Sequence, residues 1–197
     1  VWKLDAILNR GGDANLLLAS YELEQMQSMA DPVASATEWV EGLRAAPGWV
    51  RLGLRASLRL GKALGFERSL ALPLSMLAMS YGASPLLTPR GHLVGHRLPD
   101  VDGPDGRIHG RVGRWGSLLV RDAGPDLAAA AGAVGGALGV TLAPMPPALD
   151  RFGFIGCDAV FVRPDHVIGR VYGKGERPDL DGIRFALGLA LGGRQPA

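Results

Sequence analysis

The chain has 197 residues, 47% of them apolar, which allows one domain, or one domain and part of another, with a substantial core. Its 21 basic and 19 acidic residues leave a net charge of +2, so composition indicates neither a nucleic acid nor any other highly charged partner. The single cysteine excludes a disulfide within the chain and a Cys-x-x-Cys redox pair. No basic and apolar leader pattern opens the sequence at Val1, so the expected location is cytoplasmic.

The first half of the chain is predicted to be helical. Apolar residues at helical spacing, bounded by glycine and proline, predict helices over residues 2–8, 13–29, 33–46, 48–64 and 71–79. Asp13 is the expected N-cap of the second helix, and Pro32 is expected to separate the second helix from the third. Residues 84–89 are expected to be extended, because a proline disfavours helix at the residue before it.

Two of these helices allow more than one interpretation. The helix at 48–64 carries basic residues on one face and apolar residues on another: Arg51, Arg55, Arg59 and Lys62 against Trp49, Leu52, Ala56, Leu60 and Ala63. Such a helix lies on a membrane, binds nucleic acid, or is simply a solvated surface helix. The last is favoured, since no aromatic residues interrupt the basic face. Met76 and Met79 line either a hydrophobic pocket or ordinary core, and core is favoured.

Two long stretches without charge, residues 69–89 and 127–149, raise the question of a membrane span. Glycines and prolines interrupt both stretches, and neither is flanked by an asymmetric distribution of Lys and Arg. Buried helices and turns are therefore the preferred interpretation, and no membrane partner is expected.

Residues 91–110 are rich in glycine and proline and predict a boundary between domains. His92 and His96 are four residues apart, a metal-binding spacing on a helix, but the glycines beside them disfavour a helix and no third ligand is apparent. Asp100, Asp102 and Asp105 lack the final Glu of a calcium loop. The segment is therefore not assigned as a metal site.

The second half predicts an α/β layer. A strand is expected around 118–120, a helix over 125–134, strands over 140–143, 159–162 and 167–172, and a helix over 180–191 that ends at the Gly192–Gly193 pair. Pro164 and Asp165 form the expected turn between the last two strands. This order of strand, helix, three strands and helix is typical of a thioredoxin-like layer. Cys157 has no partner residues for catalysis and is interpreted as a buried structural thiol.

The residues indicate no active site of their own. No Gly-x-Gly-x-x-Gly follows a predicted strand, and the glycines of residues 132–139 lie in or after a helix, where they would not cradle a phosphate. No catalytic, cofactor-binding or metal-binding residue is assigned.

Four stretches nevertheless resemble one family. Asp158-Ala-Val-Phe-Val-Arg-Pro-Asp165 resembles the D-A-x-L-V-R-P-D-G segment of FAD-dependent aromatic and polyketide hydroxylases, the class A flavoprotein monooxygenases. Val1 to Leu4 is similar to their N-L-A-W-K-L helix, residues 17–24 to L-L-x-S-Y-x-x-E-R-x-P, and residues 95–100 to G-x-R-x-P-D. Gln25 and Gln27 stand where the family has Arg and Pro, which puts the family's contact at this arginine in doubt.

The resemblance implies the C-terminal portion of such an enzyme. Residues 1–90 would be a helical segment from the flavin and substrate domains, 91–110 a linker, and 111–197 a thioredoxin-like C-terminal domain without a redox cysteine pair. The full enzyme would use FAD and NAD(P)H, whereas this segment alone is predicted to bind no cofactor and to be inactive. Its partner would be the missing N-terminal FAD-binding domain or a second copy in a homodimer. The alternative is a stand-alone, redox-silent thioredoxin-like module for dimerisation or interaction, which a start codon directly before Val1 would favour.

Two structural predictions follow from the pattern. Motif residues at the edges of the last domain, namely Arg97, Pro99, Asp100, Arg163, Pro164 and Asp165, are expected to be structural, with the arginines bound to carboxylates or carbonyls. Large apolar residues of the helical half are expected to be exposed or covered by a partner: Leu4, Leu8, Leu16, Leu17, Trp49, Leu52 and Met76.

Overall fold

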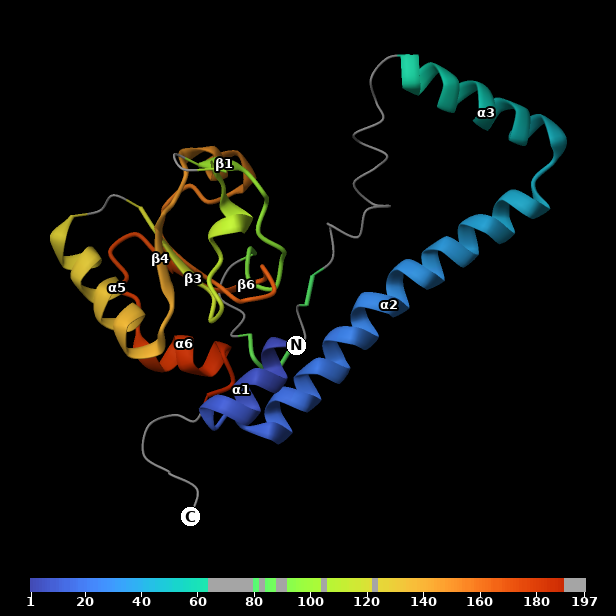
Figure 1. The fold of residues 1–197 in the computed structure, drawn as a ribbon. Helices are drawn as coiled ribbons and strands as arrows, with labels where there is room; N and C mark the ends of the chain where they lie inside the picture. Colours follow the sequence, from blue (N-terminus) through green and yellow to red (C-terminus); the bar gives the residue numbers. More distant parts are fainter. Residues whose placement is uncertain (64–79, 82–83, 88–91, 104–105, 122–123, 190–197) are drawn as a thin grey trace. The chain divides into compact units, whose positions relative to one another are not determined.

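A computed structural model describes residues 1–63, 80–81, 84–87, 92–103, 106–121 and 124–189 of the chain (Figure 1). It contains two compact units. The first combines Val1–Glu24 with the chain from Tyr81 onward, and the second is Gln25–Ser80. The predicted helix at 71–79, with Met76 and Met79, lies outside the described residues. The predicted domain division at 1–90, 91–110 and 111–197 remains a prediction.

The first unit is built on a four-stranded sheet in the order β4-β3-β5-β6. β3 is parallel to β4 and antiparallel to β5, which is antiparallel to β6. The elements are β3 (Ser117–Val120), α5 (Pro125–Leu138), β4 (Thr141–Pro144), the 3-10 helix η2 (Pro147–Phe152), β5 (Cys157–Val162), β6 (Ile168–Gly173) and α6 (Leu180–Ala186). This sequence of elements confirms the predicted α/β class with its thioredoxin-like order.

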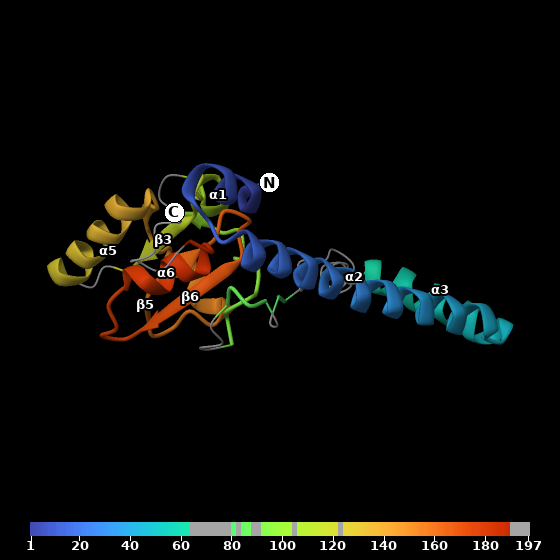
Figure 2. The same cartoon turned by 90° about the horizontal axis from the view of Figure 1, so that it is seen from below.

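The central strands β3 and β5 are buried on both faces, which explains why they are almost continuously apolar. Leu118 and Phe161 face one core with residues of α5 and α6, while Leu119 and Val160 face another with Phe154 and residues of the 93–108 segment. Neighbouring residues of a strand point to opposite faces, so each strand contributes to both cores. In the view from below, α6 lies in front of β5 and β6 (Figure 2).

The segment before the sheet lies along the start of β6. Gly95 and Leu98 donate backbone hydrogen bonds to the carbonyls of Ile168 and His166, and Arg97 forms an antiparallel bridge with Val167. A short hairpin follows, made of β1 (Asp102–Gly103) and β2 (Gly106–Arg107), and leads into the 3-10 helix η1 (Ile108–Arg111). At the opposite edge of the sheet, Pro144 of β4 has no N–H to offer to another strand.

Two helices complete this unit at its N-terminal end. α1 (Trp2–Arg10) ends at Gly11, whose φ of 62° is the left-handed conformation expected after a helix. The Asp13 side chain accepts a hydrogen bond from the Leu16 N–H (3.0 Å) at the start of α2 (Ala14–Ala45), which confirms the predicted cap. The chain after α6 returns to this turn, where Leu189 bridges Gly12 (Figure 1).

Three predicted boundaries are wrong. α2 continues past Pro32 to Ala45 as one helix instead of two. α6 ends at Ala186 rather than near residue 191, because Gly188 takes a left-handed φ of 64° and its N–H bonds back to the Phe185 carbonyl. Residues 84–87 form a turn instead of an extended segment, since the Leu87 N–H bonds to the Ser84 carbonyl across Pro85.

The second unit contains the remainder of α2 and α3 (Gly48–Ala63). Trp49 and Leu52 are 76% and 69% exposed, as expected for this half of the chain, and Arg55 and Arg59 are exposed as well. Among the described residues, no helix has the length and the apolar character that crossing a membrane requires.

Candidate functional site

A charged side chain lies in the interior of the first unit: Arg163, directly after β5, is 0% exposed. Its guanidinium donates two hydrogen bonds to the Glu24 carboxylate, from Nη1 to Oε1 (2.8 Å) and from Nη2 to Oε2 (3.0 Å). It also donates to Asp165, two residues on. Burial opposes the charge of Arg163, but the carboxylates of Asp165 and Glu24 outweigh it and raise the pKa of the guanidinium.

Glu24 uses both carboxylate oxygens twice. Besides Arg163, Oε2 accepts from Lys3 Nζ (2.7 Å) and Oε1 from the Ser84 hydroxyl (2.6 Å). Burial alone would raise the pKa of Glu24. The hydrogen bonds and charge of Arg163, with the hydrogen bonds from Lys3 and Ser84, nevertheless lower this pKa to about 2. Glu24 is therefore a fully paired, ionised carboxylate inside the protein.

The network extends to the first turn of α1. Lys3 also donates to the Ser20 hydroxyl (2.8 Å), one turn before Glu24 on the same face of α2. Burial lowers the pKa of Lys3, and the hydrogen bond to Glu24 opposes that effect. Trp2 donates from its indole Nε1 to Asp165 Oδ2 (2.9 Å), and the Arg163 guanidinium lies 5.0 Å from the centre of its ring. We call the group Trp2, Lys3, Ser20, Glu24, Ser84, Arg163 and Asp165 the Glu24 network.

Local structure presents each member of this group. Arg163 and Asp165 flank Pro164 at the turn between β5 and β6, and the turn is closed by the His166 N–H bonded to the Arg163 carbonyl (3.0 Å). Asp165 Oδ1 accepts the Val167 N–H at 3.4 Å, in the manner expected for an Asp in a turn. The predicted turn and the predicted carboxylate partners of Arg163 are thus confirmed.

The structure brings together three of the four motif stretches. Trp2 and Lys3 belong to the first, Ser20 and Glu24 to the second, and Arg163 and Asp165 to the last. Sequence reasoning singled out these stretches but did not predict that they meet, and assigned no site. The signal available was only that each stretch contains at least one charged residue among apolar neighbours.

The fourth motif stretch stays apart and is paired locally. Asp100 accepts hydrogen bonds from the His109 N–H (3.2 Å) and from Arg107 (3.1 Å), which confirms its expected local role. Arg97 contributes through its backbone, opposite Val167.

A second set of contacts ties α1 to the sheet at the surface. Arg10 and Arg114 lie 4.5 and 5.6 Å from the ring of Trp115, and Arg114 forms a two-bond pair with Asp5. Arg10 also donates to the carbonyl of Leu138, at the end of α5 (2.7 Å). The Arg114 side chain is exposed, so water and salt screen its pairing.

Two imidazoles stack beside the turn. The rings of His109 and His166 have centroids 4.4 Å apart, and His109 Nε2 lies 2.7 Å from the Leu98 carbonyl. His166 has a φ of 66°, a left-handed conformation that is uncommon for residues other than glycine. Burial lowers the pKa of His166, and the positive charge that His109 and Arg97 would place beside it lowers it further.

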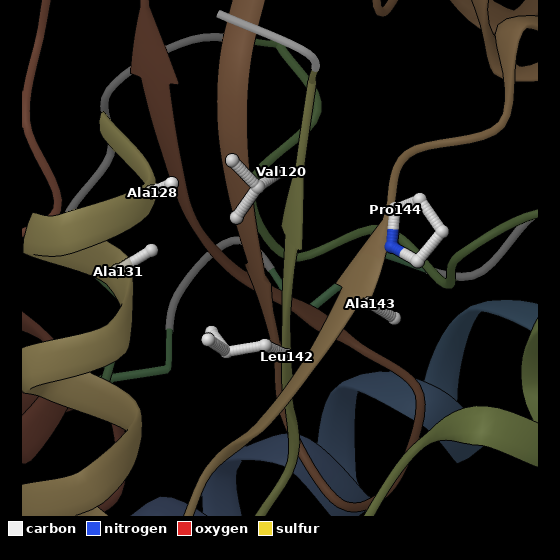
Figure 3. Close-up of a pocket in the computed structure, with 6 residues that line it drawn as sticks. All are labelled: Val120, Ala128, Ala131, Leu142, Ala143 and Pro144. Carbon is white, nitrogen blue, oxygen red and sulfur yellow. The ribbon is translucent and has the colours of Figure 1, made fainter. Parts of the chain in front are cut away.

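Two hollows in the described surface were tested for a fit to FAD. The first, of about 230 Å³, is lined only by aliphatic groups: Val120, Ala128, Ala131, Leu142, Ala143 and Pro144. Ala128 and Ala131 of α5 point toward Val120 and Leu142 of the sheet (Figure 3). The second, of about 180 Å³, is lined by three carboxylates and one arginine: Asp126, Asp158, Glu176 and Arg177. The first lacks donors for a diphosphate and the second repels it, so neither fits FAD.

Metal ligands and a thiol are the remaining candidates for chemistry among the described residues. Within them, no three His, Cys, Asp or Glu side chains gather as ligands for a metal ion. Cys157 is buried and free, and burial raises the pKa of its thiol, which disfavours the reactive thiolate. What the arrangement provides is a buried, charged connection between α1, the start of α2 and the turn after β5.

The chain is similar to known proteins in structure, and the similarity is found among solved structures. Neither the protein-family models nor the curated protein sequences match the chain. Among solved structures, the OxyS anhydrotetracycline hydroxylase from Streptomyces rimosus matches 95% of this chain with a TM-score of 0.64 and 26% identity. The rebeccamycin biosynthetic enzyme RebC with reduced flavin matches 96% with a TM-score of 0.65 and 20% identity. Aklavinone-11 hydroxylase, solved with FAD and aklavinone, matches 94% with a TM-score of 0.62 and 23% identity.

The chain spans only about 38% of the length of the two hydroxylases and 39% of RebC. The resemblance to FAD-dependent hydroxylases inferred from the sequence is confirmed by these matches, and the partial coverage is consistent with a C-terminal portion.

Proposed function

We propose that the chain is the C-terminal portion of an FAD-dependent monooxygenase that hydroxylates aromatic or polyketide substrates. The observation that carries the proposal is that nearly the whole chain matches well under half of an anhydrotetracycline hydroxylase. Two observations on the motif stretches support it. The stretches occur in the order that the family has, and three of them meet in the Glu24 network.

In this proposal the cofactor belongs to a part of the enzyme outside the chain. Neither described hollow fits FAD, so no step of a reaction is assigned to residues of this segment. The segment contributes structure: it holds α1 and the start of α2 against the α/β layer through ionised groups that are buried and paired. NAD(P)H would be consumed by the complete enzyme.

The proposed partner is an N-terminal FAD-binding domain on the same polypeptide, and a second copy of the chain is the alternative. The apolar residues exposed on α1 and α3 support the need for a partner. Sedimentation analysis of the purified chain separates the two, because a stable dimer at micromolar concentration favours the second copy.

Flavin titration of the purified chain tests the proposal directly. The chain alone is expected to leave FAD fluorescence unchanged and to oxidise no NAD(P)H, whereas the polypeptide encoded by the complete reading frame is expected to retain FAD. Tight, stoichiometric FAD binding by residues 1–197 alone would contradict it. So would a complete reading frame that begins at Val1.

A further inference from the structure

α1 is packed with the reverse of the usual arrangement. Lys3 is buried, whereas Leu4 and Leu8 are 55% and 79% exposed. A helix held by the hydrophobic effect would bury its leucines and expose its lysine. Directional polar contacts of Trp2 and Lys3 therefore hold the inner face of this helix, together with apolar contacts of Ala6 and the partly buried Ile7 and Trp2 ring.

We propose that the Glu24 network is an orientation lock, in which Glu24 and Arg163 are positioning residues that hold α1 and the start of α2 in one geometry against the sheet. The geometry supports this role because each oxygen of Glu24 receives two donors from different elements. Oε1 accepts from Arg163, in the turn after β5, and from Ser84, whereas Oε2 accepts from Arg163 and from Lys3 of α1. A rotation or shift of either helix breaks at least one of these bonds.

The free energy of a buried ion pair indicates that the Glu24 network specifies geometry more than it adds stability. Desolvating two charges costs about as much as their attraction returns, so a buried ion pair contributes little net stability compared with apolar side chains of the same volume. It does specify geometry, because the planar guanidinium fork accepts a carboxylate in only a few orientations. Apolar contacts are not directional and permit neighbouring arrangements of similar energy.

The other contacts of α1 are poor substitutes. The apolar cluster beneath it has only three fully buried members, Ala6, Leu17 and Leu86, and non-directional contacts of the partly buried Trp2, Ile7, Leu16, Trp115 and Leu189 surround them. The surface contacts of Arg10 and Arg114 on Trp115 involve long, partly solvated side chains that move with little cost. Position is therefore set mainly at the buried end of the helix.

The inference rests on the proposed function in one respect. If an FAD-binding part precedes α1 in the same polypeptide, α1 is the element through which that part joins the α/β layer. When a binding site forms in only one geometry, the apparent Kd equals the intrinsic Kd divided by the fraction of molecules in that geometry. Loss of the lock then weakens FAD binding by lowering the population of the competent geometry.

The geometric claim is tested on this chain by spin-label distance measurement. Labels are placed at two exposed positions of the first unit with Leu8→Cys and Ile155→Cys, in a Cys157→Ala background. The labelled parent is expected to give one narrow distance distribution, and Glu24→Gln a broader one. Asp126→Asn, which removes an exposed ion pair with Arg177, is the matched control and is expected to leave the distribution narrow.

A second variant keeps the test decisive if Glu24→Gln does not fold. The apolar triple variant Lys3→Met, Glu24→Leu, Arg163→Met leaves none of these three charges buried, and is expected to fold with a broadened distribution. A folded triple variant, or a folded Glu24→Gln, with a distribution as narrow as the parent's overturns the lock, because packing alone would then set the geometry.

The cofactor claim is tested on the complete enzyme. Glu24→Gln is expected to raise the Kd for FAD by about tenfold if about a tenth of the molecules keep the competent geometry. Arg163→Lys keeps the charge but not the planar guanidinium, so its Kd for FAD should lie between those of the parent and of Glu24→Gln. Asp126→Asn should have the Kd of the parent. An unchanged Kd in a variant with a broadened distribution refutes the link to the cofactor. A complete parent enzyme that binds no FAD refutes the proposed function instead, while the distance measurement still judges the lock.

Discussion

Replacing Glu24 by Gln is expected to destabilise the first unit by about 3 kcal/mol near neutral pH. The substitution keeps the shape of the side chain but removes its charge, so Arg163 is left in the interior with Asp165 alone and Lys3 without a carboxylate. Breaking a buried pair by removing one partner is costly for this reason, even where replacing all its members is not.

The magnitude follows from the pKa of Glu24. Its value of about 2, against an ordinary 4.5, corresponds to about 3 kcal/mol at about 1.36 kcal/mol for each pH unit. Because the folded pKa is the lower one, this contribution is complete above pH 4.5 and is lost as the pH falls toward about 2. The difference in free energy of unfolding between parent and Glu24→Gln should therefore shrink to about 1 kcal/mol near pH 3.

Urea unfolding of both proteins near pH 7 and near pH 3 measures this difference. Urea is preferred to guanidinium because it leaves ion pairs unscreened. Asp126→Asn serves again as control, since an exposed pair contributes at most about 1 kcal/mol. A difference below about 1 kcal/mol at neutral pH, or one that does not change with pH, would show that Glu24 is not the paired, ionised carboxylate described above.

Three further outcomes are expected. The pKa of His166 is lowered in the folded protein, so the unfolded chain binds a proton there more readily. Tm should therefore fall as the pH is lowered from about 7.5 to about 5.5, and this fall should be smaller in His166→Asn. Gly188→Ala should cost about 2–3 kcal/mol in urea unfolding, because its Cβ would lie 2.4 Å from Leu17 Cδ2 at a φ of 64°, whereas Gly175→Ala, unobstructed at a φ of 79°, should cost about 1 kcal/mol. Cys157 should react with a thiol reagent slowly in the folded protein and rapidly in urea; fast reaction of the native form would contradict its burial.

Local signals in the sequence were sufficient for most of the fold. Asp13 caps its helix as its residue type predicts, and Pro125 begins α5 where a proline is tolerated. Errors arose where tertiary structure overrides the local signal. Pro32 does not end α2, and Gly188 rather than the Gly192–Gly193 pair ends the last helix, because the chain must turn there to pair with Gly12.

The site could not be predicted in the same way. Glu24 and Arg163 are 139 positions apart, and nothing near either residue indicates the other. Burial has the same limit: Leu4 and Leu8 are exposed as expected, but Leu17 is completely buried, so that expectation was wrong. All three are leucines at helical spacing, and only the packing of Leu17 on Ala6 and Leu86 distinguishes it.

The hydrogen bond from Ser84 to Glu24 joins residues 60 positions apart, so the chain that departs along α2 is back beside its point of departure when it reaches Ser84. The ends of that excursion are held at a fixed spacing, whatever its length. The entropy of closing such a loop grows only with the logarithm of its length, and shortening it from about 60 residues to about 8 would change the closure term by only about 2 kcal/mol. In terms of closure entropy alone, adding or removing residues between Glu24 and Ser84 would therefore cost the first unit little.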